Sequence, residues 1–315
     1  MKISLITPAH KASRTGNRTT ADRWARILRS LGHRVRVATR YDVLPADVMI
    51  ALHAWRSADS IRAYRARYAQ RPLIVGLGGT DVYRFQQSEP EVTRGSMALA
   101  DMLVGLHDLV GEAIPAEMRG KLRVIHQSAP KPRRRLPPLR DVFEVLVIGH
   151  LRDEKDPLRS ACAARELPSG SRIRVVHLGM AYDARWSEAA HTEMAENPRY
   201  RWLGEVPGWR VRRALARAPL MVLSSVMEGG ANVISEAIAA GGRCWRRRSR
   251  ARSDCSGAPI PATFRCGTRR RWRRCCIAPK PIPNSSPNCD ATARNARRCS
   301  IRRGSETPGA TFCNR

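Results

Sequence analysis

The first 241 residues of this 315-residue chain contain almost no cysteine, and the chain lacks long hydrophobic runs. Cys162 is the only cysteine before residue 242, which excludes a disulfide framework for that part. No apolar run approaches the roughly 20 residues of a membrane-spanning helix. The N-terminus begins with a strand-like pattern and lacks the pattern of a signal peptide. These absences predict a cytoplasmic protein without a membrane span.

Negative charge is also scarce. The chain has 57 Lys and Arg but only 27 Asp and Glu, which gives a net charge of +30. Residues 242–315 hold 19 of the basic and 3 of the acidic residues, so more than half of the excess lies in the last quarter of the chain. A basic nucleic-acid-binding protein is therefore an alternative function. Because no helix-turn-helix, zinc-finger or aromatic stacking motif accompanies the charge, we do not favour nucleic acid as a partner.

Short apolar runs alternate with helical patterns over residues 1–241. Strands are expected at 3–7, 35–38, 48–51, 73–77, 103–106, 122–125, 143–148, 174–178, 200–203 and 220–223. Helices are expected at 19–31, 60–69, 211–217 and 232–240. The alternation predicts an α/β protein with doubly wound parallel sheets. Trp24, Ile27, Leu28 and Leu31 are expected on one side of the first helix, and the basic helix 60–69 is expected to face solvent.

A proline-rich and basic segment divides the chain. Residues 129–140 contain four prolines and a run of Lys and Arg, a composition typical of a semi-rigid linker. We therefore predict an N-terminal domain at 1–128 and a C-terminal domain at 141–241. The arginine run has no interleaved aromatic residues, so a solvated linker is favoured over a nucleic-acid patch.

A glycine-rich turn follows the apolar run at 220–223 and opens the last helix. Free N–H groups at such a helix start suit phosphate. Glu228 precedes the turn and Glu236 lies about two helical turns further on, so both carboxylates can face one groove and bind sugar or ribose hydroxyls. The alternative is an ordinary helix start with two surface glutamates. The candidate residues of this motif are Glu228, Gly229, Gly230, Ala231, Asn232 and Glu236.

A second polar motif, residues 149–155, follows the strand expected at 143–148. Arg152 and Lys155 can supply two cations to a diphosphate, Arg as a planar fork and Lys as a point charge. The alternative is a surface charge pair. Because ligands of doubly wound sheets bind beyond the carboxyl ends of the strands, we expect this motif and the glycine-rich turn to meet at one edge of the sheet.

Together the two motifs resemble glycosyltransferase family 4. Glu228 and Glu236, spaced Glu-x7-Glu, are similar to the donor-site motif in which the first Glu contacts the transferred sugar and the second contacts the ribose. The spacing from Gly149 to Lys155 is similar to the family's phosphate site, with Arg152 in the arginine position. The resemblance implies two Rossmann-like domains of the GT-B fold and a UDP-sugar donor. It also implies no cofactor and no metal, and the chain has no Asp-x-Asp to hold one.

Further segments resemble, within this family, the selenosugar synthases of selenoneine biosynthesis. They are residues 3–8, 16–18, 23–25, 31–33, 79–83, 149–152 and 228–232. The resemblance implies transfer of a sugar from UDP-N-acetylglucosamine to selenophosphate, with another acceptor as the alternative. It implies that Gly229, Gly230 and Ala231 present N–H groups to the diphosphate or sugar, and that Arg152 and Lys155 neutralise the leaving UDP.

The first domain is then expected to face the acceptor with Gly16, Asn17 and Asp81. A turn residue is the alternative role for Asp81. His10, His150 and His177 are expected to be structural, and His150 is the one most worth testing.

The apolar pattern stops after residue 241. Residues 242–315 carry eight of the nine cysteines but no Cys-x2-Cys pair. A disordered basic tail and a cysteine cluster are two interpretations. A third is a slipped reading frame, because regrouping the codon bases permits Pro-Val-Leu-Ala from Gly242 and an amphipathic helix from the codons of 271–285. We interpret 242–315 as a frame-shifted, disordered tail that leaves the second domain incomplete and the chain nearly inactive.

Overall fold

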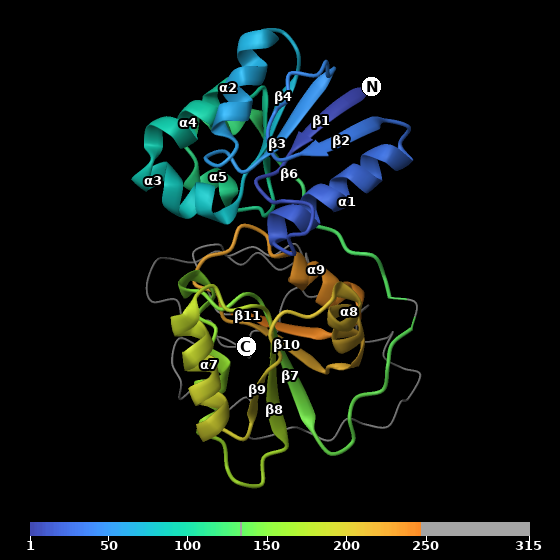
Figure 1. Cartoon of the computed structure of the whole chain (residues 1–315), viewed down its shortest axis with the longest axis vertical. Coiled ribbons are helices and arrows are strands. Elements are labelled where there is room, and N and C mark those ends of the chain that lie inside the picture. Colours follow the sequence, from blue (N-terminus) through green and yellow to red (C-terminus); the bar gives the residue numbers. More distant parts are fainter. Residues whose placement is uncertain (133, 247–315) are drawn as a thin grey trace, which may run out of the picture.

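The computed structural model describes residues 1–132 and 134–246. It contains two α/β domains, one above the other in Figure 1, joined by a segment that runs along one side of the molecule. The predictions of a disordered tail and a slipped frame fall on 247–315 for the most part, and there they lie outside the described residues. None of the described helices is both long and apolar enough to cross a membrane.

The first domain has a parallel six-stranded sheet with the order β2-β1-β3-β4-β5-β6. Its strands are β1 (Lys2–Ile6), β2 (Arg34–Ala38), β3 (Val48–Leu52), β4 (Leu73–Gly76), β5 (Met102–Gly105) and β6 (Leu122–Val124). Its helices are α1 (Gly16–Ser30), α2 (Ala58–Arg67), the π-helix η1 (Asp81–Phe85), α3 (Gln86–Ser88), α4 (Pro90–Leu99), α5 (Val110–Ala113) and the 3-10 helix η2 (Ala116–Lys121). The strand order reverses between β1 and β3, which is the topological switch point of this sheet.

The second domain has a parallel five-stranded sheet with the order β11-β10-β7-β8-β9. Its strands are β7 (Phe143–Ile148), β8 (Ile173–Leu178), β9 (Tyr200–Trp202), β10 (Leu220–Leu223) and β11 (Arg243–Arg246). Its helices are the 3-10 helix η3 (Asp153–Lys155), α6 (Arg159–Arg165), α7 (Ala184–Glu196), α8 (Gly208–Arg217) and α9 (Asn232–Ala239). Buried residues of α6 lie in the core on one face of this sheet, and those of α8 and α9 lie in the core on the other.

Strand β11 corrects the prediction that the second domain ends at residue 241 and lacks the strand after α9. Arg243–Arg246 pairs in parallel with all four residues of β10. Trp245 is only 4% exposed and packs in the core on the α6 face, whereas Cys244 packs against the core on the opposite face. Arg243 is exposed. The alternation of a strand therefore directs Cys244 and Trp245 to opposite faces of the sheet, and the charge of Arg243, at the start of the strand, stays exposed.

Helix α1 confirms half of the apolar side predicted for it, since Trp24 and Leu28 pack against the core of the first sheet. Ala21 and Ala25 are buried, and Trp24 packs beside them. Ile27 and Leu31 are 40% and 66% exposed. The buried side chains follow an i, i+3, i+4 stripe, which a helix directs to one side; Ile27 and Leu31 belong to a neighbouring stripe.

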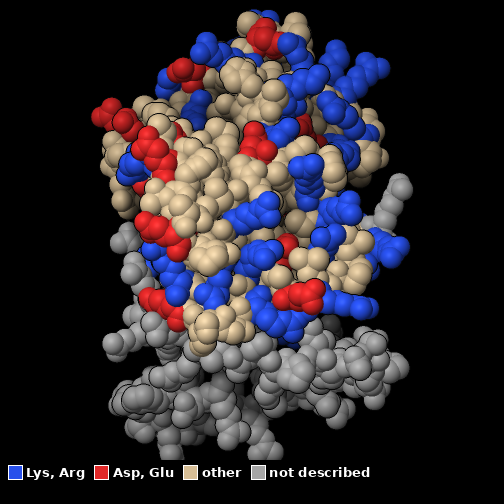
Figure 2. Space-filling model, turned by 60° about the horizontal axis from the view of Figure 1, so that its bottom comes forward, with Lys and Arg blue, Asp and Glu red and all other residues tan. Residues whose placement is uncertain are grey.

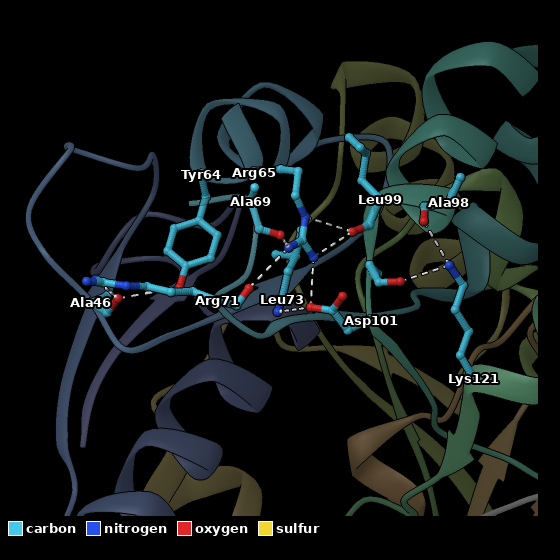
Figure 3. Close-up of polar contacts among 11 residues, drawn as sticks. Ala46, Tyr64, Arg65, Ala69, Arg71, Leu73, Ala98, Leu99, Asp101 and Lys121 are labelled. Atoms are coloured by element: carbon cyan, nitrogen blue, oxygen red, sulfur yellow. Dashed lines mark hydrogen bonds and ion pairs between the residues drawn. The ribbon is translucent and has the colours of Figure 1, made fainter. Parts of the chain in front are cut away.

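Helix α2 is not the solvated helix that the sequence predicted. It buries Ile61 and Tyr64, and its Arg65 lies at the N-terminal ends of strands β4 and β5 (Figure 3). The Arg65 guanidinium donates to the carbonyl oxygen of Leu99 at 2.9 Å and pairs with Asp101 at 2.7 Å. The planar guanidinium fork thus ties α2 to the end of α4 and the start of β5.

Candidate functional site

Two loops of the second domain meet at its switch point, between β7 and β10. Ser224 Oγ in the loop after β10 donates to the carbonyl oxygen of Lys155 at 2.9 Å. The Val226 N–H donates to the carbonyl oxygen of Glu154 at 2.9 Å. These bonds bring the two predicted motifs together at the carboxyl edge of the sheet, where ligands of such sheets bind.

Lys155 and Glu228 form an ion pair between these loops. Their side chains are 21% and 16% exposed, so the pair is largely shielded from water. Arg152 lies nearby, with its Nε 3.8 Å from the Glu154 carboxylate. That Nε is buried and has no hydrogen-bond partner among the described residues. A buried donor without a hydrogen bond is costly, so an anion closer to this Nε than Glu154 would be favourable.

His177 of β8 contacts the loop that follows β7. Its Nε2 lies 3.0 Å from the carbonyl oxygen of Gly149, and its Nδ1 lies 3.1 Å from the Tyr200 hydroxyl. Because a carbonyl only accepts, Nε2 carries the proton and Nδ1 accepts from Tyr200. Burial lowers the pKa of His177 to about 4, although the Gly149 carbonyl opposes the shift. These contacts give His177 the structural role expected from the sequence.

His150 is partly buried beside the same loop. Its Nδ1 accepts a hydrogen bond from the Met180 N–H at 3.3 Å. Burial lowers the pKa of His150, and Glu205 partly opposes this shift.

Glu236 lies in a cavity of about 240 Å³ between the two domains. Burial raises the pKa of its carboxyl group, and the nearby Arg212 opposes the shift. Glu228 is not among the residues that line this cavity, and the prediction that the two carboxylates face one groove stays a prediction. The other polar residues of the lining are Thr19, Asp22, Arg23, Arg26, Ser128, Arg212 and Asn232.

The two domains touch through their glycine-rich turns. A Cβ placed on Gly79 would lie 2.5 Å from the Gly229 nitrogen, and one placed on Gly229 would lie 2.2 Å from the Gly79 nitrogen. Gly230 has a positive φ of 113° and packs against Leu106. Side chains cannot be accommodated at this contact, which explains why both turns are built from glycine. We call this contact between Gly79 and Gly229 the glycine seam.

Other predicted residues also lie between the domains. Asn232 Nδ2 donates to the carbonyl oxygen of Gly16 at 3.2 Å and lies 3.1 Å from Thr20 Oγ1. Asn17 is partly buried in the first turn of α1. Arg84 of η1 pairs with Glu154 across the domains at 3.1 Å. The structure therefore brings Gly16 of the first domain and Asn232 of the second domain together.

Asp81 does not face a ligand. Its side chain is completely buried. Its carboxylate accepts the N–H groups of Ala54, Trp55 and Gly78 at 2.9, 3.0 and 2.8 Å. These bonds join the loops after β3 and β4. The turn-residue alternative is therefore correct, and the expected direct contact of Asp81 with an acceptor is wrong.

The sequence analysis missed His53, which directly follows β3. Its Nδ1 lies 2.6 Å from Asp81 Oδ1, and its Nε2 lies 2.9 Å from Thr80 Oγ1. Its backbone has a φ of +75°, an uncommon value for a residue other than glycine. A histidine directly after a buried strand near a switch point was the available signal.

Comparison with solved structures identifies the fold. HepE of Anabaena in complex with UDP-glucose superposes with a TM-score of 0.60 at 14% identity, over 79% of this chain and 81% of that one. Sucrose-phosphate synthase of Thermosynechococcus elongatus gives 0.61 at 14% identity, over 79% and 81%. AviGT4, a glycosyltransferase of avilamycin A biosynthesis, gives 0.56 at 16% identity, over 84% and 82%. The chain has the GT-B fold.

The two predicted Rossmann-like domains are thus confirmed. Protein-family models and curated protein sequences give no match. At 14–16% identity, structural similarity carries the fold to this chain and leaves activity to be argued from its own residues.

Proposed function

We propose that the chain is a glycosyltransferase that uses a UDP-sugar donor. The observation that carries this proposal is the Lys155–Glu228 pair at the switch point of the second sheet, in the same loop as Arg152, whose Nε makes no hydrogen bond among the described residues. Cations and a carboxylate at one strand edge suit a ligand with a diphosphate and a sugar. HepE, which shares the fold, was solved in complex with UDP-glucose.

Each residue of the pair has a role in this proposal. Glu228 accepts hydrogen bonds from the sugar hydroxyls. Lys155 and Arg152 neutralise the charge that develops on the leaving diphosphate, which is electrostatic stabilisation of the transition state. The ligand's phosphate replaces Glu228 as the partner of Lys155, so the carboxylate becomes free to bind the sugar.

The nucleoside lies further along α9 in this proposal. The N–H groups of Gly229, Gly230 and Ala231, which precede the first turn of α9, face the diphosphate. Glu236 accepts from the ribose hydroxyls in the cavity between the domains, where Arg212 favours its ionised form. One extended ligand would therefore contact both glutamates, although they do not share a cavity.

The donor sugar and the acceptor rest on the sequence resemblance. We propose UDP-N-acetylglucosamine as donor and selenophosphate as acceptor, with formation of a selenosugar. Incubation of the protein with both compounds should give UDP and a product with the mass of an N-acetylhexosamine selenophosphate. UDP release without this product would indicate another acceptor. Binding of UDP without any release would favour an inactive chain.

Binding of UDP is the first prediction. UDP should raise the melting temperature of the protein, since a ligand that binds only the folded state stabilises it. Lys155→Ala and Arg152→Ala should each weaken UDP binding by roughly tenfold or more, because charge-assisted contacts contribute about 1.5–3 kcal/mol each. Titration calorimetry measures both effects.

Arg201→Ala is the matched control for these variants. Arg201 is an exposed basic residue on β9 of the same domain, so its loss removes one charge without touching the site. If Arg201→Ala weakened UDP binding equally, the effect of the other two variants would be due to the lower net charge of the protein and not to the site. Absence of a UDP effect together with tight, salt-sensitive RNA binding would instead support the nucleic-acid alternative.

A further inference from the structure

Three side chains at the carboxyl ends of β3 and β4 form a hydrogen-bonded chain. Asp81 Oδ1 lies 2.6 Å from His53 Nδ1, and His53 Nε2 lies 2.9 Å from Thr80 Oγ1. Asp81 is completely buried and His53 is 3% exposed, whereas Thr80 is partly accessible. These hydrogen bonds therefore connect a buried carboxylate to a hydroxyl that solvent can reach.

The direction of the hydrogen bonds follows from the distances. Two acceptor atoms 2.6 Å apart would repel, so the His53 proton is on Nδ1 and points to the Asp81 carboxylate. The Arg56 N–H also points at this nitrogen as a donor, at 3.3 Å, and the much shorter contact with Asp81 decides where the proton lies. In the neutral imidazole, Nε2 then accepts the proton of the Thr80 hydroxyl. The oxygen lone pairs of Thr80 are left for an outside donor.

The surroundings keep this arrangement fixed. The Asp81 carboxylate is held by the three N–H bonds from the loops after β3 and β4. Phe85 stacks on Trp55 with ring centroids 4.2 Å apart and also packs against His53. Asp81 and Phe85 bound the π-helix η1, a rare element that is frequent at functional sites.

Thr80, the last residue of this hydrogen-bonded series, lies beside the glycine seam. Thr80 directly follows Gly79, whose backbone contacts Gly229, and Gly229 directly follows Glu228. The Thr80 hydroxyl is therefore in the turn that faces the proposed sugar-binding loop from the other domain.

We propose that Thr80, His53 and Asp81 form a proton relay that activates an acceptor carrying a proton on its nucleophilic atom, water included; this inference rests on the proposed glycosyltransferase function. The acceptor gives its proton to Thr80 Oγ1 as Thr80 gives its own to His53 Nε2. The acceptor atom bonds to the anomeric carbon, and the bond from that carbon to the UDP oxygen breaks, its electron pair leaving with UDP. Asp81 stabilises the imidazolium that forms, as in other carboxylate–histidine–hydroxyl arrangements.

Thr80→Val and Thr80→Ser form the decisive pair of variants. Valine keeps the branched shape and removes the hydroxyl, whereas serine keeps the hydroxyl. With UDP-N-acetylglucosamine as donor and water as acceptor, Thr80→Val should lower kcat roughly 100-fold, within the usual range of general-base catalysis. Thr80→Ser should keep most of the activity. UDP affinity should be the same in both, because neither change touches the donor contacts.

Two further measurements separate a relay from a structural role. Azide is an anionic acceptor that has no proton to lose, so it should react equally with both variants. The wild-type rate of hydrolysis should fall in D₂O, and this isotope effect should shrink in Thr80→Val. His53→Asn should behave like Thr80→Val, since asparagine tolerates the positive φ but cannot carry the proton.

The outcomes are distinguishable. Equal hydrolysis by Thr80→Val and Thr80→Ser, in proteins that bind UDP, overturns the relay and leaves the proposed function standing. A wild-type protein that neither binds nor releases UDP overturns both. An NMR spectrum in which neutral His53 carries its proton on Nε2 overturns the relay independently of any activity.

Discussion

At the scale of single residues, His177 shows how a loop of the candidate site is held by a neutral imidazole. The ring is buried between the Gly149 carbonyl and the Tyr200 hydroxyl, and burial lowers its pKa to about 4. An imidazolium would lose the hydrogen bond from Tyr200, because both of its nitrogens are donors. Protonation of His177 therefore opposes the folded state.

The pH dependence of stability follows from this shift. Between pH 6.5 and about 4 the unfolded chain binds a proton at His177 that the folded chain does not bind. Stability is thus complete above pH 6.5 and is lost as pH falls toward 4, by about 3 kcal/mol in total. Urea unfolding of the wild type should shift to lower urea between pH 7 and pH 5, and more strongly than in His177→Gln. Equal shifts in the two proteins would contradict this assignment.

At the scale of elements, β11 completes the second sheet. It covers the outer side of β10, and Trp245 fills the core under α6 that Val222 of β10 also lines. A Rossmann-like sheet whose last helix had no following strand would expose the apolar side chains of β10. The strand thus stabilises the element that carries the Glu228 loop.

Removal of the Trp245 ring tests the contribution of β11. Trp245→Ala should destabilise the second domain by about 3–5 kcal/mol, the usual cost of deleting a buried large aromatic side chain. Thermal unfolding should then show a clearly lower transition temperature. Arg243→Ala, on the same strand but exposed, should change stability by less than about 0.5 kcal/mol.

A Trp245→Ala protein that melts like the wild type would mean that β11 does not dock. That result would return residues 243–246 to the interpretation as part of a disordered tail. The slipped reading frame itself stays a prediction, and the coding DNA around Gly241 decides it.

At the scale of the whole molecule, the surface carries both basic and acidic side chains. Figure 2 shows one face, on which Lys and Arg side chains are more frequent toward the right of the view and Asp and Glu side chains toward the left. Several of the cations are paired across or within the domains, as Arg84 is with Glu154.

The glycine seam sets how closely the two domains approach. Gly79→Ala places a methyl carbon 2.5 Å from the Gly229 nitrogen, which is too close for two atoms that are not bonded. Such overpacking typically costs about 1–3 kcal/mol. The variant should melt at a lower temperature, and amide hydrogen exchange in the loop after β10 should accelerate.

Gly95→Ala is the matched control for this variant. A Cβ at Gly95, inside α4, meets nothing within 4 Å, so the same substitution should stabilise by about 0.5–1 kcal/mol. Identical melting of the two variants would show that the seam is not formed in solution.

Much of this arrangement was predictable because it depends on local patterns. The strands at 143–148 and 220–223 are continuous apolar runs, and parallel sheets place the loops after neighbouring strands at one edge. Lys155 and Glu228 could therefore be expected to meet from their positions alone. The same reasoning predicted six strands in the first domain, each within a few residues of the observed bounds.

The unpredicted features depend on relations between distant residues. His53 and Asp81 are 28 positions apart, and only the adjacency of β3 and β4 in the folded sheet brings them together. Asp81 looked like a ligand-binding residue because its three N–H partners are main-chain groups, which carry no side-chain signal. β11 was missed because two of its four residues are arginines, whereas Trp245 between them is buried in the core.

The glycine seam also has a consequence for affinity. Any ligand that bonds to the Gly229 N–H needs space that Gly79 occupies, so it enters only those conformers in which the domains stand further apart. The apparent dissociation constant then equals the intrinsic one divided by the fraction of such open conformers. A substitution that adds a side chain at the seam enlarges this fraction and tightens donor binding. The same substitution hinders the closure of the two domains that expels water from the reaction. Tighter donor binding and slower sugar transfer would therefore appear together.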